Sequence, residues 1–517
     1  MTQRTRAIHP FLIAPFPILL LYSRNLHLID LFEIWLPIAL NLGTVTLLWG
    51  ILRGLRLDGP RASLIVSTGL LLCFGFGPAV RLVDHLEVVP NRLAQEFLAL
   101  AIESLWLAGV VVLAIKTPDL ARRSTGFLNA SACALLALSI LGIARERWEQ
   151  PAVIPVRLDD RPIPAFHPPS GRLPDVYFLV LDAYGRSDAL RRVIGFDNSA
   201  FLARLKQRGF FVADHGTANY TQTMLSLSAT LNLRYLDDLA GCPSEDRHPL
   251  KTLITESLVF RSFRKLGYRV VRFDSGFDAT DSIVGDLNLG PPERLRTFPS
   301  LVADQTPLWL ILGSRNTYDP RRLHRQRILN VFENLPASSH PSDAPTFTFA
   351  HVVAPHPPFL FGADGRDYSE REGAYTLNDT RPEGPDGSAE YARRYRDQAA
   401  YLSARVEQVV ERILSTSKVE PIIIIQGDHG SGSRFDANTP EPNDLFERMT
   451  VLNAIYLPET IRGEINPSIS LVNTFRLVFD RGFGSKLGLL PDRSFYSPYP
   501  QPYLFREVTG QIHEPVR

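Results

Sequence analysis

Two segments of the sequence place acidic and imidazole side chains directly after apolar runs. Asp182 follows the run 176–181, and Asp428 and His429 follow four isoleucines and two further residues from 422 on. A buried strand rarely ends in adjacent charge and imidazole without a partner, because burying such groups unpaired is costly. Carboxylates and imidazoles together are ligands for a divalent metal. We therefore interpret Asp182, Asp428 and His429 as candidate metal ligands, although Asp182 alone would also fit a turn or helix cap.

A third apolar run, 346–353, contains one histidine and is followed by a second. His351 lies inside the run, and we interpret it as a core or pocket-wall histidine rather than a ligand. His356 follows the run in a Pro-His-Pro-Pro turn and is the better candidate for a functional histidine. In open α/β sheets ligands collect at the carboxyl ends of strands. We expect His356 to meet the acidic residues at one sheet edge.

The segment 219–228 offers hydroxyl groups where a loop enters a predicted helix. The free amides and positive potential of a helix N-terminus suit a tetrahedral oxyanion. Thr221 or Thr223 could instead act only as a helix cap. Because candidate metal ligands are also present, we interpret a threonine hydroxyl of this segment as a nucleophile rather than only a helix cap.

Short apolar runs alternate with helical patterns after residue 174, which is typical of an α/β domain. The predicted strands are Val176–Leu181, Tyr268–Phe273, Thr346–Val353, Pro421–Gln426 and Val451–Leu457. The predicted helices are Ala200–Arg208, Thr255–Leu266, Arg321–Asn334, Ala389–Leu414 and Val472–Phe479.

The first third of the chain is much more apolar, and a membrane helix needs about 20 such residues. Five spans are predicted, the first of them short and interrupted by Pro15 and Pro17: Pro10–Tyr22, Leu31–Leu52, Ser63–Val80, Phe97–Ile115 and Gly126–Ile143. We predict an α-helical membrane anchor over 1–148, a Pro-rich linker over 149–174 and a catalytic domain over 175–517.

The charges of the short loops predict the orientation of these spans. Eight Arg or Lys residues fall on one side and three on the other. By the positive-inside rule the N-terminus is cytoplasmic and the domain after the spans is periplasmic or extracellular. Glu33 and Glu103 fall within spans toward the outer leaflet, where each is either functional or hydrated at the interface. The eight are Arg4, Arg6, Arg53, Arg56, Arg61, Lys116, Arg122 and Arg123, and the three are Arg24, Arg81 and Arg92.

Composition excludes some partners. A net charge of +1 with 21% charged residues gives no nucleic-acid signal. Of the three cysteines, only Cys242 lies after the anchor, so the domain cannot form an internal disulfide.

Asp182, the threonine-bearing loop, Pro355-His356-Pro357 and Asp428-His429-Gly430 together resemble the metal framework of the alkaline phosphatase and sulfatase superfamily. With spans ahead of the domain, the layout is most similar to lipoteichoic acid synthases and lipid A phosphoethanolamine transferases. The resemblance implies a sulfatase-like α/β fold. It also implies a metal held by Asp182, Thr223, Asp428 and His429, with Thr223 and His356 as the catalytic residues. Thr223 is preferred to Thr221 because Ser226 completes the Thr-x-x-Ser of the phosphoethanolamine transferases.

The resemblance further implies a function. We expect a metal-dependent enzyme of the bacterial inner membrane that moves a phosphoglycerol- or phosphoethanolamine-type group from a lipid donor to an envelope glycan or lipid. The metal is expected to be zinc or manganese, with magnesium or calcium as alternatives. A membrane-bound sulfatase-like hydrolase (phosphodiesterase, phosphatase or sulfuric ester hydrolase) is an alternative. A second alternative is a binding or scaffold protein that keeps the fold without a metal.

The sequence also departs from these families. Asp182 stands where the transferases use Glu, and Ser431 stands where Asp-His-Gly is often followed by Glu. The next histidine after His429 is His513, which argues against a full second zinc site. Ser187 to Arg191 fits a formylglycine motif by letter, but it lies directly after Asp182 rather than in a separate loop. We interpret that match as a coincidence.

Overall fold

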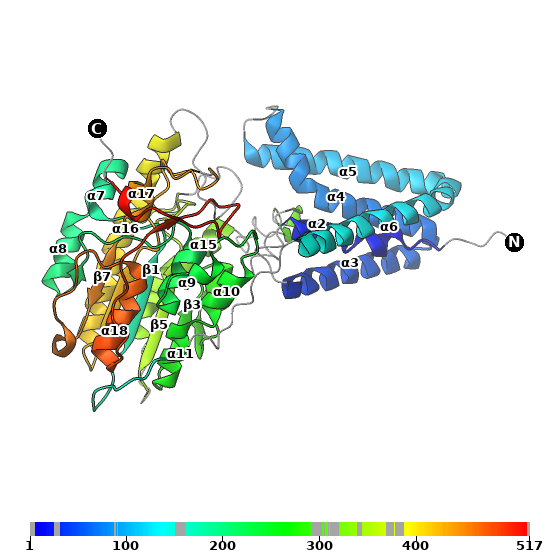
Figure 1. Cartoon of the computed structure of the whole chain (residues 1–517). Coiled ribbons are helices and arrows are strands. Elements are labelled where there is room, and N and C mark those ends of the chain that lie inside the picture. Colours follow the sequence, from blue (N-terminus) through cyan, green and yellow to red (C-terminus); the bar gives the residue numbers. More distant parts are fainter. Residues whose placement is uncertain are drawn as a thin grey trace. The chain divides into compact units, whose positions relative to one another are not determined.

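The computed structural model forms two compact units, which are treated separately below (Figure 1). Unit 1 comprises Met1–Gln150 and Leu295–Asp319, and unit 2 comprises Pro151–Arg294 and Pro320–Arg517. The structure describes residues 6–24, 31–86, 89, 91–149, 162–291, 302–303, 305–308, 310, 320–338, 344–368, 377, 387–439 and 441–513.

Unit 1 is helical, and its helices expose apolar side chains suited to lipid. In its described part, four helices are long and apolar enough to cross a membrane. Large apolar side chains on them, such as Leu105, Trp106 and Phe127, are more than half exposed. Because a patch of this kind is unstable in water but matches acyl chains, the chain is a membrane protein. The four helices are α3 (Trp35–Gly54), α4 (Gly59–His85), α5 (Arg92–Lys116) and α6 (Pro118–Glu149).

The expected first span is a broken apolar segment, made of α1 (His9–Ile13) and α2 (Phe16–Ser23). Polar side chains of the long helices hold its start. The Asn129 side-chain oxygen accepts from the amides of Ile8 and His9, and the His9 ring lies 2.6 Å from the Ser67 hydroxyl. Whether this segment crosses the membrane as a fifth span stays a prediction.

The two carboxylates predicted within spans lie in different settings. Glu33 belongs to a short 3-10 turn (Leu31–Ile34) that precedes α3. Glu103 is buried on α5, where its carboxylate faces Gly75 of α4. Gln305, far along the chain, also belongs to this unit, and its carbonyl accepts from the Gly77 amide at 3.2 Å.

Unit 2 contains a seven-stranded sheet in its described part, in the order β2-β7-β6-β1-β5-β3-β4. The central strands β6, β1, β5 and β3 are parallel, and β4 joins them in the same direction. At the other edge β7 and β2 run antiparallel to their neighbours. Each predicted strand is confirmed within two residues at either end. The strands are β1 (Val176–Leu181), β2 (Phe211–Val212), β3 (Arg269–Phe273), β4 (Leu287–Leu289), β5 (Thr346–Val352), β6 (Ile422–Gln426) and β7 (Asn453–Tyr456).

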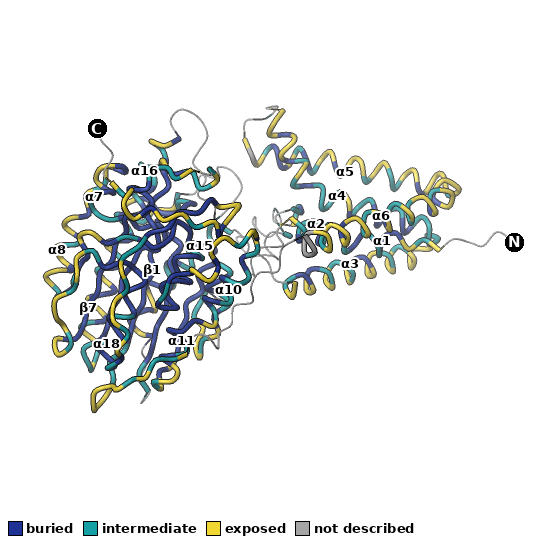
Figure 2. Tube along the Cα trace, viewed as in Figure 1, coloured by how far each residue is buried: buried dark blue, intermediate teal, exposed yellow. Residues whose placement is uncertain are grey.

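Helices cover both faces of this sheet (Figure 1). All six residues of β1 are buried (Figure 2), and they alternate between two apolar cores because strand side chains alternate between faces. Leu179 packs with α8 (Ser199–Gln207), α15 (Pro320–Asn334) and α16 (Gly387–Thr416) in one core. Phe178 packs with α9 (Thr223–Asn232), α11 (Leu258–Lys265) and α18 (Thr474–Phe483) in the other. The predicted α/β class is therefore confirmed.

Shorter elements complete unit 2. The helix predicted over 255–266 corresponds to α11, which begins only at Leu258 because Ser257 has an extended backbone. The preceding α10 was not predicted. The short helices are α7 (Ser187–Ala189), α10 (His248–Thr255), α12 (Asp278–Asp281) and α17 (Leu445–Met449), and a small sheet pairs β8 (Phe495–Tyr496) with β9 (Arg506–Glu507). A π-helical turn covers Leu190–Ile194, and 3-10 turns cover Asp237–Leu239, Leu335–Ala337, Glu459–Ile461, Leu471–Asn473 and Thr509–Gln511.

The predicted linker lies partly outside the described residues. Its described part, 162–174, has no helix or strand. Ile163, Phe166 and Leu173 nevertheless pack against the sheet core, and the His167 amide donates to the Phe483 carbonyl at 2.8 Å. This stretch of the Pro-rich segment is therefore attached to unit 2.

Candidate metal centre

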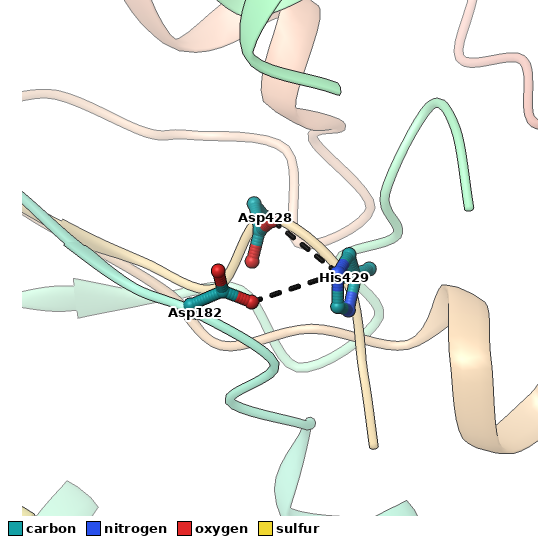
Figure 3. Close-up of side chains that lie close together, drawn as sticks. All are labelled: Asp182, Asp428 and His429. Atoms are coloured by element: carbon teal, nitrogen blue, oxygen red, sulfur yellow. Dashed lines mark ion pairs between the residues drawn. The ribbon is translucent and has the colours of Figure 1, made fainter. Parts of the chain in front are cut away.

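Three neighbouring parallel strands deliver the predicted site residues to one sheet edge. In the register of the sheet, Val180 of β1 lies opposite Gln426 of β6 and His351 of β5. Asp182 comes two residues after Val180, and Asp428 comes two residues after Gln426. Ligand atoms of Asp182, Asp428 and His429 all lie within 4.8 Å of one another (Figure 3).

Each carboxylate in this cluster is held by one oxygen only. Asp428 Oδ1 accepts from the Ala183 amide at 3.0 Å, and Asp182 Oδ2 lies 3.2 Å from His351 Nε2. The other oxygens, Asp182 Oδ1 and Asp428 Oδ2, are buried without a hydrogen-bond partner among the described residues. They lie 3.6 and 3.5 Å from His429 Nε2. Two converging, unsatisfied carboxylate oxygens beside an imidazole nitrogen fit a divalent cation.

The orientation of His429 agrees with that fit. Its Nδ1 lies 2.9 Å from the Gly430 carbonyl, which can only accept, so Nδ1 carries the proton. Nε2 then keeps its lone pair and faces the cluster. It also lies 3.1 Å from Thr223 Oγ1 and 3.2 Å from Arg448 Nη2. This is the usual arrangement of a metal-binding histidine, whose other nitrogen donates to a fixed acceptor.

Close backbone packing fixes the loop that carries Asp428 and His429. A Cβ atom on Gly427 would collide with the Tyr184 backbone, and one on Gly430 would collide with the Glu447 carbonyl. Only glycine allows these approaches. The turn after β1 is equally constrained, because Ala183 has a φ of 64° and its carbonyl accepts from the Tyr395 hydroxyl. Such a conformation is costly for a residue other than glycine and is typical of functional sites.

Thr223 and Thr221 differ in access to the cluster. Thr223 is the first residue of α9, is partly exposed and contacts His429. Thr221 is fully buried, and its hydroxyl has no hydrogen-bond partner among the described residues. One turn into α9, the Ser226 hydroxyl donates to the Asp428 carbonyl at 2.7 Å and ties the helix start to the end of β6. Of these two threonines, Thr223 is therefore the one whose hydroxyl contacts the cluster.

His356 lies beside the cluster without belonging to it. Its backbone amide donates to the Asp182 carbonyl at 3.1 Å, and its ring centroid is 6.2 Å from that of His429. Its Nδ1 lies 2.6 Å from the Pro357 carbonyl and so carries a proton. Burial alone would raise the pKa of the Asp182 carboxyl, but neighbouring imidazoles, His356 foremost, hold that pKa below its usual range.

His351 is more closely connected to the site than its interpretation as a core or pocket-wall histidine suggests. It is buried, but its Nε2 contacts Asp182 and its Nδ1 lies 3.2 Å from the Thr280 hydroxyl. It therefore orients a candidate ligand rather than filling space. The signal in the sequence was its place in β5, on the strand that neighbours β1.

Arg448 is a site residue that sequence reasoning missed entirely. It lies on α17, is 3% exposed, and directs its guanidinium at His429. Its neighbour Glu447 is buried and accepts from the Ser431 hydroxyl, the amide and hydroxyl of Ser433 and the Arg434 amide. Glu447 thus closes the loop after His429 onto α17. Arg448 comes from a short helix before an antiparallel strand, where the rule of parallel strand ends gives no signal.

The formylglycine-like segment has a local role. Ser187 begins α7, and the adjacent Asp188 forms an ion pair with Arg186 at 2.7 Å. That contact accounts for the acidic residue within the segment.

Comparison with known proteins finds similarity at the level of structure only. No family model and no curated protein matches the sequence. The C-terminal periplasmic domain of EcEptC from Escherichia coli, in complex with zinc, covers 67% of this chain and 96% of its own, at 11% identity and a TM-score of 0.43. The integral membrane protein lipooligosaccharide phosphoethanolamine transferase A from Neisseria meningitidis covers 92% and 94%, at 12% identity and a TM-score of 0.40.

A phosphonate monoester hydrolase of Agrobacterium radiobacter covers 62% of this chain and 80% of its own, at 13% identity and a TM-score of 0.37. Phosphoethanolamine transferases, which the sequence resembles, are among these solved structures. The chemistry has to be derived from the residues of the site.

Proposed function

We propose that the chain is a membrane-anchored, metal-dependent enzyme that transfers a phospho-substituent of the phosphoglycerol or phosphoethanolamine type. The donor would be a membrane lipid and the acceptor an envelope glycan or lipid. The carrying observation is the buried Asp182, Asp428 and His429 cluster, with two unsatisfied carboxylate oxygens and the Thr223 hydroxyl at 3.1 Å.

Asp182, Asp428, His429 and Thr223 would hold the ion, with zinc or manganese favoured by the mixed oxygen and nitrogen donors. When bound, the ion makes a hydroxyl beside it more acidic and polarises the oxygens of an ester. The start of α9 adds positive potential at the same place.

In the first step, Thr223 Oγ1 attacks phosphorus and forms an oxygen–phosphorus bond as the bond to the leaving alkoxide breaks. The hydroxyl proton goes to water, and His356 Nε2 gives a proton to the leaving oxygen. In the second step, His356 takes a proton from the acceptor hydroxyl, which attacks phosphorus. The bond to Thr223 then breaks, and its oxygen regains a proton from water.

The membrane unit supports a lipid substrate. Four apolar helices in the described part hold the chain in a bilayer, where lipid head groups are concentrated. The loop charges support a periplasmic or extracellular catalytic domain, on a bacterial inner membrane. If water replaces the acceptor, the same site acts as a hydrolase.

Mass spectrometry of Thr223 after incubation with a native lipid extract tests this function. A phosphoglycerol or phosphoethanolamine adduct on the peptide containing Thr223 is the expected result, and its mass names the transferred group. Thr223→Ala is the control that must lack it. An unmodified Thr223 in a metal-loaded protein that consumes the lipid would contradict the covalent mechanism. A metal-free protein without turnover would favour the scaffold alternative.

A further inference from the structure

The guanidinium of Arg448 is a buried cation beside the candidate metal cluster. Its Nη2 and the Thr223 hydroxyl both lie at hydrogen-bond distance from one atom, His429 Nε2, at 3.2 and 3.1 Å. The two groups are therefore no more than about 6.3 Å apart. A phosphorus atom about 3–3.5 Å from the attacking oxygen leaves room for one of its oxygens to meet Nη2.

Arg448 is held rigidly in that place. Its Nε donates to the Thr221 carbonyl at 2.8 Å, and its Nη1 lies 3.4 Å from the Gly430 carbonyl. The guanidinium carbon also stacks 4.9 Å from the centre of the Phe435 ring. Because these contacts fix the plane of the guanidinium, little conformational freedom is lost when Nη2 binds an anion.

The charges of the site favour an anion-binding role for Arg448. The carboxylates of Asp182 and Asp428 carry two negative charges, which one divalent cation neutralises. A phosphodiester brings a further negative charge into the buried site, and an uncompensated charge there is costly. A guanidinium donates to phosphate oxygens with strong, charge-assisted hydrogen bonds.

We infer that Arg448 binds a non-bridging oxygen of the transferred phosphoryl group. A bound ion would take the lone pair of His429 Nε2, so Nη2 would donate to the substrate oxygen in place of that nitrogen. Arg448 is then a catalytic residue of this site, a role that rests on the proposed function.

The test uses the full-length, metal-loaded protein in detergent and measures the binding of inorganic phosphate by calorimetry. Arg448→Met keeps a long apolar side chain at this position and removes the guanidinium charge. We expect the metal content to be unchanged and the Kd for phosphate to rise about 10- to 100-fold. On a soluble phosphodiester, kcat/KM should fall by at least the same factor.

Arg247 provides the matched control. It is buried like Arg448 and stacks on a ring, 4.2 Å from the centre of Tyr499, but it donates to Gln222 and the Tyr499 carbonyl. Arg247→Met should leave phosphate affinity within about twofold of the parent protein, since its guanidinium makes no charged contact at the cluster.

Unchanged phosphate affinity in a metal-loaded Arg448→Met would overturn the inference and make Arg448 a structural residue. If that variant loses its metal or fold, Arg448→Lys decides. The lysine ammonium is a point charge on a shorter side chain, so the variant should still bind phosphate, but about three- to thirtyfold more weakly. Equal affinity in the lysine variant would also overturn the inference. Phosphate binding requires no turnover, so a parent protein that binds phosphate through Arg448 but turns over no phosphodiester would contradict the proposed function alone.

Discussion

Two acidic clusters lie beside strand ends of the same sheet and use their carboxylates differently. Asp281, next to the end of β3, accepts from the amide and hydroxyl of Ser275, from the Gly276 amide and from Arg272, so both of its oxygens are engaged. Asp182 and Asp428 each leave one buried oxygen unsatisfied. A buried carboxylate oxygen without a hydrogen-bond partner indicates a site for a bound ligand. A carboxylate whose oxygens are both hydrogen-bonded indicates a structural role.

His351 connects these two clusters. Its Nε2 contacts Asp182, its Nδ1 contacts Thr280, and the Thr280 hydroxyl lies 2.9 Å from that of Ser275, which donates to Asp281. The satisfied cluster can therefore hold the unsatisfied one in position. The following variants separate the two kinds of carboxylate, from the largest expected effect to the smallest.

Removal of the hydroxyl at the unsatisfied cluster should have the largest effect. We expect Thr223→Ala to lower kcat by about 10⁴-fold or more, because it removes the nucleophile, with little change in stability because the N-cap of α9 is Gln222 rather than Thr223. Thr221→Ala, which changes a buried hydroxyl, should be milder. Steady-state kinetics on a soluble phosphodiester and thermal melts measure both effects. An inactive Thr221→Ala beside an active Thr223→Ala would move the nucleophile by two residues.

Two matched substitutions test the comparison directly. Asp428→Asn should lose the bound metal and the activity without a lower melting temperature in metal-free buffer, because it removes an unpaired buried charge. Asp281→Asn should keep the metal but lose about 1–3 kcal/mol of stability, because its hydrogen bonds cannot all be remade. Metal analysis and melts in chelator are the measurements. The opposite pattern would reverse the assignment of the two clusters.

The connecting histidine should have an intermediate effect. His351→Ala should weaken metal binding about 10- to 100-fold, as loss of a residue that orients a ligand does. His351→Gln should recover part of that loss if its amide donates to Asp182. Titration with a competing chelator measures the affinity. His324→Ala is a suitable control, since this buried histidine contacts the Val353 carbonyl instead, and an equal loss in both variants would mean a general packing defect.

The smallest expected effect is a pH dependence at Glu447. Burial raises the pKa of this carboxyl above its usual value of 4.5, against the hydrogen bonds from Ser431 and Ser433. A raised folded-state pKa means that its stabilising contribution is fully present below pH 4.5 and is lost as pH rises through the folded value. The melting temperature of the parent protein relative to Glu447→Gln should therefore fall as pH rises. A difference that is constant with pH would show that Glu447 does not titrate in this way.

Much of the site could be predicted because its residues directly follow strands. Asp182, His356, Asp428 and His429 follow long apolar runs, and adjacent parallel strands bring their ends together. Their convergence in the structure follows from that rule, while their chemical roles stay predictions. The four long apolar helices were also evident, since lipid demands long uninterrupted apolar runs.

The remaining features depend on tertiary contacts that local patterns do not encode. Arg448 reaches His429 only because Glu447 closes the loop that contains Ser431 and Ser433. The short strands β2 and β4 have two and three residues, too few for a recognisable alternation. Helix α10 was not predicted, and the extended backbone of Ser257 moves the start of α11 three residues beyond the predicted one.

The hydrogen bond between Ala183 and Asp428 joins residues 245 positions apart in the chain. On a chain synthesised from its N-terminus, β1 emerges long before β5 and β6, the two strands between which it lies. Contacts of such sequence separation form slowly, because a long loop must close before they stabilise anything. The candidate metal cluster therefore cannot exist in a partly made domain, and we expect metal uptake to be among the last events of folding. Adding a chelator during synthesis and removing it afterwards should not impair the yield of active protein.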